Sequence, residues 1–235
     1  RHTRCSGVSW VGDVYKRQAQ QSTTPMILGT APIGKLLAQY SIPAIIASVA
    51  TSLYNIVDSM FIGHGVGPMA IAGLAITFPL MNLVIAFCTL IAVGGATISS
   101  IYLGQKNVSK ATDTVNNVTI LCLIHSVVFG GLTLVFLDKI LLFFGATPQT
   151  LPYAREFMQI ILYGTPISYI FIGLNNLMRA TGYPKKAMIS ALLSVCVNII
   201  LAPIFIFALD WGIKGAATAT VCGQFVAFVW VLWHF

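Results

Sequence analysis

Charged residues are scarce in this sequence. Asp, Glu, Lys and Arg make up 8% of its 235 residues and only six are acidic, whereas 57% of the chain is hydrophobic. In ordinary soluble domains about a quarter of the residues are charged, so water is not the main solvent of this chain. The charges fall in short clusters between apolar stretches of about twenty residues or more, the length that a helix needs to cross a bilayer. The sequence therefore predicts an all-α polytopic membrane protein.

A concentrated basic face is also lacking, although the formal net charge is +7. Four of the thirteen Lys and Arg residues lie within the first eighteen positions, and the others are spread between the apolar stretches. Nucleic-acid binding requires a clustered basic surface, whereas scattered loop charges are typical of membrane topology. The expected partner is the lipid bilayer and not nucleic acid.

Recognisable catalytic and metal-binding patterns are missing as well. The cysteines within apolar runs stand alone, which predicts neither a disulfide framework nor a metal site; they are Cys88, Cys122, Cys196 and Cys222. The sequence contains no HExxH, no GxSxG and no phosphate-binding glycine loop. Because an enzyme within the membrane would need clustered catalytic groups, we expect neither an enzyme nor a bound cofactor.

The N-terminal segment does not resemble the rest of the chain. Residues 1–18 lack the apolar core of a signal peptide, and their last six residues, DVYKRQ, resemble a reading frame through a sequencing-library adapter. We interpret them as a sequencing or cloning scar, with a native cytoplasmic tail as the alternative. Residues 19–34 are predicted to be a cytoplasmic segment, and residues 35–235 a transmembrane domain. The last apolar run, from about Gly215, reaches Phe235 without a polar flank, which predicts truncation inside a membrane segment.

Six membrane spans are predicted from windows of about nineteen residues. They cover residues 36–62, 69–103, 115–137, 157–177, 187–209 and 215–235. The second run is longer than a bilayer requires and contains Pro79 and the pair Gly94 and Gly95. We therefore expect it to be kinked or tilted, with its last turns in water.

The basic residues between these spans divide unequally between the two sides. One side holds Lys35, Lys106, Lys110, Arg179, Lys185 and Lys186, and the other holds Lys139, Arg155 and Lys214. Because cytoplasmic loops carry the excess of Lys and Arg, the first side is predicted to be cytoplasmic. The N-terminus is then cytoplasmic, and the protein is a multi-pass protein of the cell membrane.

Asp58 is the only carboxylate predicted to lie in mid-span, where an ionisable side chain is usually kept because it faces a cavity or a partner. Polar residues of the first span recur at spacings of three and four, which places most of them on one helix face: Ser48, Thr51, Ser52, Asn55, Asp58 and Ser59. We expect Asp58 to accept a proton or a metal cation, with Thr51 and Asn55 as possible cavity-lining residues. The alternative is that Asp58 lies near the end of the span and reaches interfacial water.

The fifth and sixth spans carry weaker polar signals. Asn198 and Ala202 share a face of the fifth span, and Pro203 follows; its missing backbone donor is expected to bend the helix. The sixth span opens with GIKGAATAT, residues 212–220, whose small side chains allow helices to approach closely. Thr220 can lend a hydroxyl from this string.

Several strings occur in the order and spacing of the multidrug and toxin extrusion (MATE) family, which the chain resembles from about Lys35 to its end. They are LYNIVDSMFIGHGVG, FPLMN with the later GGATISSIYLGQ, NNLMRATGYPKKAM, NIILAPIFIF and GIKGAATAT. The resemblance implies a six-transmembrane-helix bundle that forms the N-terminal lobe of a twelve-helix, two-lobe transporter. The substrate cavity would lie between the lobes, so the C-terminal lobe of the same polypeptide is an implied partner. Asn176, in the third string, is a further possible cavity-lining residue.

The family builds a cation site in this lobe, and its positions fall on Asp58, Asn198, Ala202 and Thr220 of this sequence. Many members that this chain resembles have Asp where this chain has Ala202, and alanine offers no oxygen to a sodium ion. The implied function is secondary antiport, in which entry of H⁺ or Na⁺ drives export of small, amphipathic and often cationic compounds. The Ala202 departure favours H⁺.

Two other transport functions stay open. A flippase or exporter of lipid-linked saccharide, in the same wider superfamily, would be expected to carry basic residues inside its cavity, and this sequence has none in mid-span. A channel would differ from an antiporter in flux saturation and in its dependence on a counter-ion.

Overall fold

The fold is built from long helices. A computed structural model describes residues 32–234, so the predictions for residues 1–18 and for most of 19–34 lie outside the described residues. The elements are α3 (Ile33–Gly65), α4 (Pro68–Gly104), α5 (Val108–Val135), α6 (Leu137–Phe143), α7 (Leu151–Ala180), α8 (Pro184–Pro203), the π-helical turn η1 (Ile204–Ala208) and α9 (Gly212–His234). The described residues contain no strand.

The prediction of six spans is confirmed. Within residues 32–234, six helices are long and apolar enough to cross a membrane: α3, α4, α5, α7, α8 together with η1, and α9. Most begin or end a few residues outside the predicted limits, because the helices continue past the apolar runs into polar turns. The start of α5 is an example: Asn107 accepts a hydrogen bond from the backbone N–H of Lys110 at 3.2 Å, a side-chain cap that the apolar pattern does not reveal.

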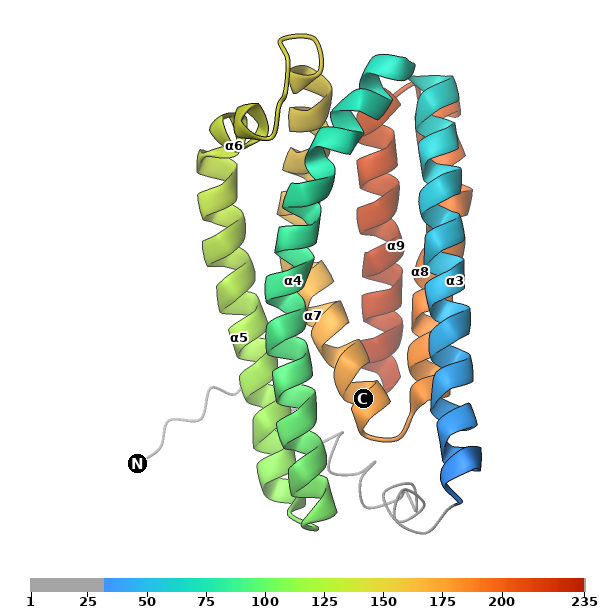
Figure 1. Cartoon of the computed structure of the whole chain (residues 1–235), viewed down its shortest axis with the longest axis vertical. Coiled ribbons are helices and arrows are strands. Elements are labelled where there is room, and N and C mark those ends of the chain that lie inside the picture. Colours follow the sequence, from blue (N-terminus) through green and yellow to red (C-terminus); the bar gives the residue numbers. More distant parts are fainter. Residues whose placement is uncertain (1–31, 235) are drawn as a thin grey trace.

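Prolines lie inside α4 and at the end of α8. Pro79 lies inside the 37-residue α4, and the first part of this helix leans away from the rest (Figure 1). After Pro203 the chain changes from α-helical to π-helical hydrogen bonding, with the Leu209 N–H bonded to the Ile204 carbonyl at 3.0 Å. A π-helical turn is a frequent feature of functional sites.

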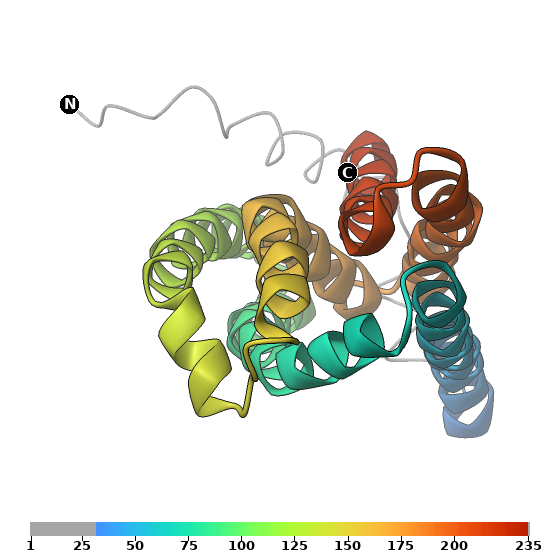
Figure 2. The ribbon, with the colours of Figure 1, turned by 90° about the horizontal axis from the view of Figure 1, so that it is seen from above.

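The helices form two groups. α4, α5 and α7 pack together, with the short α6 above α5, while α8 and α9 pack on each other and α3 packs mainly on α8 (Figures 1 and 2). α7 joins the groups, since it contacts both α4 and α9. α3 and α4 are connected by a turn but otherwise barely touch, so the two groups diverge on this side.

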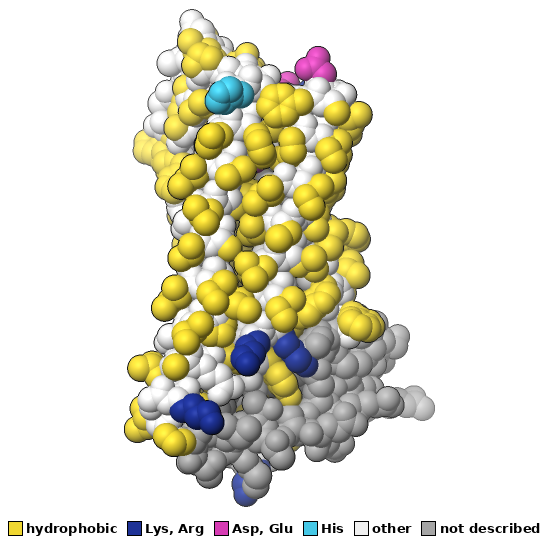
Figure 3. All heavy atoms as spheres, turned by 90° about the vertical axis from the view of Figure 1, so that its right-hand side faces the viewer, with side chains coloured by type: hydrophobic (Ala, Val, Ile, Leu, Met, Phe, Trp, Pro, Cys, Tyr) yellow, Lys and Arg dark blue, Asp and Glu magenta, His cyan; other side chains and the backbone are white. Residues whose placement is uncertain are grey.

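Charges differ between the two ends of the bundle. The end that carries the start of α3 and the α4–α5 turn, here called the basic end, shows only Lys and Arg on one face (Figure 3). On the same face, the acidic and His side chains in view lie at the opposite end, here called the α6 end. Two ion pairs lie at the α6 end, Arg155 with Asp138 at 3.3 Å and Lys214 with Glu156 at 3.2 Å. Cytoplasmic placement of the basic end stays a prediction.

Small residues bring α9 against its neighbours, as the GIKGAATAT string predicts. A Cβ at Gly215 would lie 2.8 Å from the backbone carbon of Phe205. A Cβ at Gly223 would lie 2.6 Å from the Ser194 carbonyl oxygen. Since neither backbone can move aside, only glycine permits these approaches.

Candidate functional site

Asp58 lies inside the packed lobe. It occupies the last third of α3, where its residue is 7% exposed, and its Oδ1 atom is buried without a hydrogen-bond partner. A carboxylate that reached interfacial water would be exposed, so the described structure does not match that alternative. α3 packs mainly on α8 and also contacts α9 and η1.

A hydrogen-bond network joins three helices one turn from Asp58. Asn198 Nδ2 of α8 donates to Thr220 Oγ1 of α9 at 3.0 Å, and the Tyr54 hydroxyl of α3 lies 3.1 Å from the same oxygen. Thr220 donates its own proton to the Ala216 carbonyl at 3.1 Å. Because a hydroxyl has one proton to give, Thr220 accepts from both partners, and the Tyr54 hydroxyl is the donor.

Two acceptor oxygens remain unpaired in this region. Asn198 is 3% exposed and its Oδ1 atom has no partner, in the same way as Asp58 Oδ1. Leaving a buried acceptor unpaired costs about 1–3 kcal/mol, so such atoms are uncommon in native proteins. Two of them beside one interhelical network can receive a proton, a water or a cation.

Tyr54 is the main residue of this network that sequence reasoning missed. It precedes Asp58 by four residues and therefore lies on the same face of α3. That spacing was the available signal, but the predicted polar face contained only Ser, Thr, Asn and Asp. A tyrosine hydroxyl contributes to such a face from the end of a long aromatic side chain.

A small cavity extends from the network toward the basic end. Its volume is about 160 Å³, and it is lined by Thr51, Tyr54, Phe171, Ala191, Ser194, Val195, Asn198, Thr220 and Gln224. Gln224 also accepts a hydrogen bond from the Ser168 hydroxyl of α7. One water in the liquid occupies about 30 Å³, so the cavity has room for a few waters between polar side chains. Thr51, predicted as a possible cavity-lining residue, lies here.

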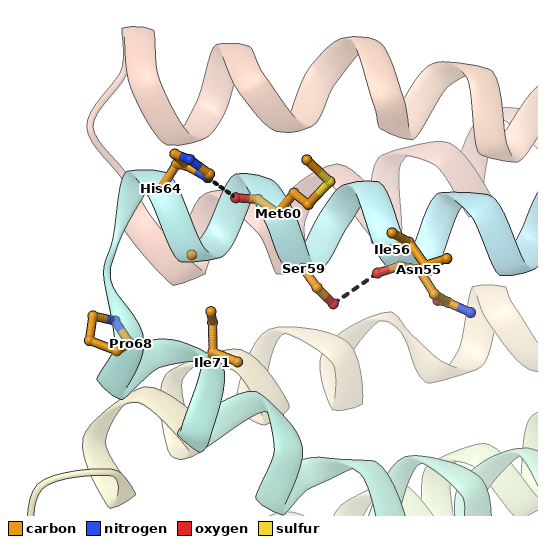
Figure 4. A pocket seen from close by; sticks show the side chains of 8 residues that line it. Asn55, Ile56, Ser59, Met60, His64, Pro68 and Ile71 are labelled. Carbon is orange, nitrogen blue, oxygen red and sulfur yellow. Dashed lines mark hydrogen bonds between the residues drawn. The ribbon is translucent and has the colours of Figure 1, made fainter.

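Asn55 lies in a different and larger pocket. This pocket, of about 740 Å³, lies between α3 and the start of α4 near the turn that connects them, and its lining is mostly apolar (Figure 4). Polar groups enter it from Asn55, Ser59 and His64 of α3. The Ser59 hydroxyl donates to the backbone carbonyl of Asn55 at 2.8 Å. This hydrogen bond does not involve the side-chain amide of Asn55. The pocket combines an apolar wall with a few polar groups, as ligand sites commonly do.

Asn176 is separate from both pockets. Its side chain donates to the Ile172 carbonyl of its own helix at 2.9 Å. The preceding residue, Asn175, is instead the one that connects helices: its Nδ2 atom donates to the Ala187 carbonyl at 3.0 Å and to the Ser190 hydroxyl at 2.6 Å. Asn175 thus holds the basic end of α7 against α8.

Ala202 is fully buried one turn after Asn198 on α8. Its methyl group supplies no ligand atom on this side of the site. The polar side chains that the helices bring together are therefore those of Tyr54, Asn198 and Thr220, with Asp58 one turn along α3. Among the described residues, no group of three or more His, Cys, Asp or Glu side chains could hold a metal ion.

Comparisons with known proteins agree with this architecture. The MatE family model matches residues 43–204. The multidrug export protein MepA of Staphylococcus haemolyticus (strain JCSC1435) is 32% identical over 203 residues, which cover 86% of this chain and 45% of that protein. The chain thus spans about half the length of the curated relatives that it matches.

Solved structures show the same relation. A MOP superfamily transporter from Pyrococcus furiosus Vc1 (DSM3638) superimposes with a TM-score of 0.85 at 27% identity, over 91% of this chain and 47% of that chain. A crystal structure of a MATE protein in complex with MaD3S superimposes with a TM-score of 0.83 at 28% identity, over 91% and 48% of the two chains. The six-span lobe therefore corresponds to about half of a larger fold.

Proposed function

The chain belongs to the MatE family, and from that premise we propose that it is the N-terminal lobe of a secondary active exporter of small amphipathic, often cationic compounds. Two facts support this proposal: relatives named as multidrug export proteins match most of the chain, and the chain spans about half of their length. The second lobe of the same polypeptide would complete the substrate cavity.

The observation that carries the proposal is the pair of unpaired, buried oxygens on Asp58 and Asn198 beside a network of three helices. An ionised carboxylate only accepts hydrogen bonds, whereas a protonated one also donates. Binding of a proton therefore changes both the charge and the bonding where α3 meets α8 and α9. A group that binds its ligand differently in two conformations shifts the population between them, and this shift couples ion entry to export.

We further propose that the coupling ion of this lobe is H⁺. A sodium ion is a hard cation that needs several oxygen ligands, and Ala202 supplies none. A proton needs only one acceptor, and the Asp58 carboxylate can supply it. The cavity of about 160 Å³ beside Tyr54 and Thr220 offers room for waters through which the proton leaves toward the basic end.

The pocket between α3 and α4 is the proposed contribution of this lobe to the substrate path. Its apolar lining suits the hydrophobic part of an amphipathic compound, and Asn55 and Ser59 supply neutral polar contacts. All Lys and Arg residues of the described chain lie near helix ends and not in mid-span. This distribution suits a cationic substrate and disfavours a phosphate-bearing lipid-linked saccharide.

The orientation follows from the same charges. We propose that the basic end is cytoplasmic and that the protein lies in the cell membrane, because Lys and Arg accumulate on the cytoplasmic side. The pocket between α3 and α4 then opens toward the outer side, as a release path requires.

The proposal is tested with the complete transporter in sealed vesicles. Efflux of a cationic dye is measured while a proton gradient is imposed and then abolished, with and without sodium. We expect saturable efflux that requires the proton gradient. Flux that does not saturate and ignores the gradient would instead identify a channel.

A further inference from the structure

A further pocket lies on the opposite side of the lobe from Asp58, at the α6 end. It has a volume of about 420 Å³ and lies between α4, α5 and α6. Leu83, Phe129, Leu132, Phe136 and Phe143 form much of its wall, and Lys139 is its only charged lining residue. The proposed antiport mechanism does not use this pocket.

The pocket exists because α6 folds back over the end of α5. α5 ends at Val135, and the seven residues of α6 bury Leu137 and Leu141 against the bundle. Two aromatic residues, one just before this short helix and one at its end, remain uncovered: Phe136 is 47% exposed and Phe143 is 85% exposed. A large apolar surface of this kind marks a contact with lipid or protein.

An exposed apolar stripe of α5 leads along the span into this pocket. It consists of Leu121, Ile124, Val128, Leu132 and Val135, whose spacings of three and four place them on one helix face. Because α5 is a candidate membrane span, such a face meets the acyl chains of the bilayer. The stripe passes through Leu132 into the wall of the pocket, so an acyl chain can follow α5 and enter it.

Lys139 gives the mouth of the pocket a positive charge. Its Nζ atom lies 5.9 Å from the centroid of the Phe136 ring, and within the described residues it forms no salt bridge. The adjacent carboxylate does not neutralise it, since Asp138 pairs with Arg155 at 3.3 Å. An unpaired lysine above an apolar pocket at the membrane boundary complements an anionic headgroup on an apolar chain.

We propose that this pocket binds an anionic glycerophospholipid, with one acyl chain between α4 and α5 beneath α6 and with the phosphate of the headgroup on Lys139. A cationic export substrate does not suit the site because Lys139 repels it. A soluble phosphate compound does not suit it either, because it leaves the apolar wall empty. Such a lipid ties α6 to α4 and α5.

The test is native mass spectrometry of the complete transporter, exchanged into detergent with equal amounts of dioleoyl phosphatidylglycerol and dioleoyl phosphatidylethanolamine. We expect preferential retention of the anionic lipid. Lys139→Ala should reduce that preference about fivefold, equivalent to about 1 kcal/mol for one basic contact, and Lys139→Arg should preserve it. Lys214→Ala is the matched control, because this lysine lies at the same end but pairs with Glu156.

The acyl-chain contact is tested separately by filling the pocket. Leu132→Trp should abolish retention of both lipids, whereas Leu121→Trp, on the same stripe but outside the pocket, should not. Leu83→Trp fills the pocket from α4 if the first variant does not fold. An unchanged lipid preference in Lys139→Ala, equal retention in both α5 variants, or displacement of the lipid by excess glycerol phosphate would each overturn the proposal.

Discussion

The two helix groups differ in the surroundings of their buried polar atoms. In the α4–α5–α7 group, His125 stacks between Phe129 and Tyr169, with ring centroids 5.4 and 5.5 Å away, and the Tyr169 hydroxyl donates to the Val84 carbonyl at 2.8 Å. Atoms without a hydrogen bond occur there too, on Ser99, Asn116 and His125. The carboxylate oxygen among them, Asp138 Oδ1 of α6, forms an ion pair with Arg155 at 3.3 Å.

In the α3–α8–α9 group the unpaired oxygens, on Asp58 and Asn198, lie beside a network of hydrogen bonds between helices. Side chains from all three helices meet at Thr220, a cavity adjoins them, and Asp58 follows one turn from Tyr54. The contrast teaches that an unpaired buried atom is weak evidence of a site when it stands alone. An ionisable group beside polar side chains of several helices is stronger evidence, because helix movement can then change its surroundings.

The largest expected difference in efflux is between replacing an ionisable residue of one group, Asp58, and replacing one of the other group, His125. Asp58→Asn should lower proton-driven dye efflux to the level of vesicles without transporter, because the amide keeps the shape and cannot titrate. His125→Phe should leave efflux near wild type, because a phenyl ring can take its place in the aromatic stack. Efflux is measured at equal protein levels. Normal efflux by Asp58→Asn would return Asp58 to a structural role.

The next effect concerns how tightly each group is packed. Gly223→Ala should destabilise the protein by about 1–3 kcal/mol, because its Cβ would lie 2.6 Å from a backbone carbonyl of α8. Gly95→Ala should also destabilise the protein, since its Cβ would lie 2.0 Å from a methyl and 3.3 Å from the Cβ of Val118, a side chain with one strongly preferred rotamer in a helix. Gly94→Ala, with open space around it, is the control. Thermal melts in one detergent rank the three, and an equal loss for Gly94→Ala would contradict the packing argument.

A third prediction concerns the ligand that α8 lacks. Ala202→Asp adds a carboxylate one turn from Asn198, and the enlarged set of oxygens should make efflux sensitive to sodium. Efflux at fixed pH with and without a sodium gradient measures this effect. Ala202→Asn, which adds an oxygen without charge, should give a weaker response. Strong sodium dependence of the wild-type protein that disappears in Asp58→Asn would refute coupling to H⁺ in this lobe.

The smallest effect compares two tyrosine hydroxyls. Tyr54→Phe and Tyr169→Phe each remove one hydrogen bond, with an expected loss of about 1 kcal/mol of stability. Only Tyr54→Phe should also slow efflux, because its hydroxyl belongs to the network at Thr220, whereas the Tyr169 bond joins α7 to α4. Efflux rates normalised to folded protein distinguish the two. Equal rates would place Tyr54 among the packing residues.

The helices were readable from the sequence because bilayer-spanning segments are a local property. An apolar run of sufficient length between charged clusters indicates a span without reference to any other part of the chain. Six spans were predicted, and six were found in the part of the chain that the structure describes. Asp58 was identified for a similar reason: a single acidic residue within an apolar run needs no structural context to be noticed. Asn198 and Thr220 entered through the family resemblance.

Other features depended on how the helices meet. Tyr54 was missed because its role depends on the position of Thr220, which lies 166 residues away in the chain. Asn176 was chosen over Asn175, although Asn175 is the residue that contacts α8. Helix α6, which follows α5 after one residue, lies almost wholly beyond the predicted span of residues 115–137, in a segment that was interpreted as a loop.

The sequence by itself determined the solvent of this protein, the number of its spans and the place of its one mid-span carboxylate, because each depends on residue types along one continuous segment. Tertiary structure decided which polar atoms meet, where the cavities lie and that Asp138 pairs with Arg155 and not with the adjacent Lys139. These features depend on the rotation and crossing of helices distant in the chain. Successive residues of an α-helix are about 100° apart around its axis. Adjacent residues such as Asn175 and Asn176 can therefore face different surroundings.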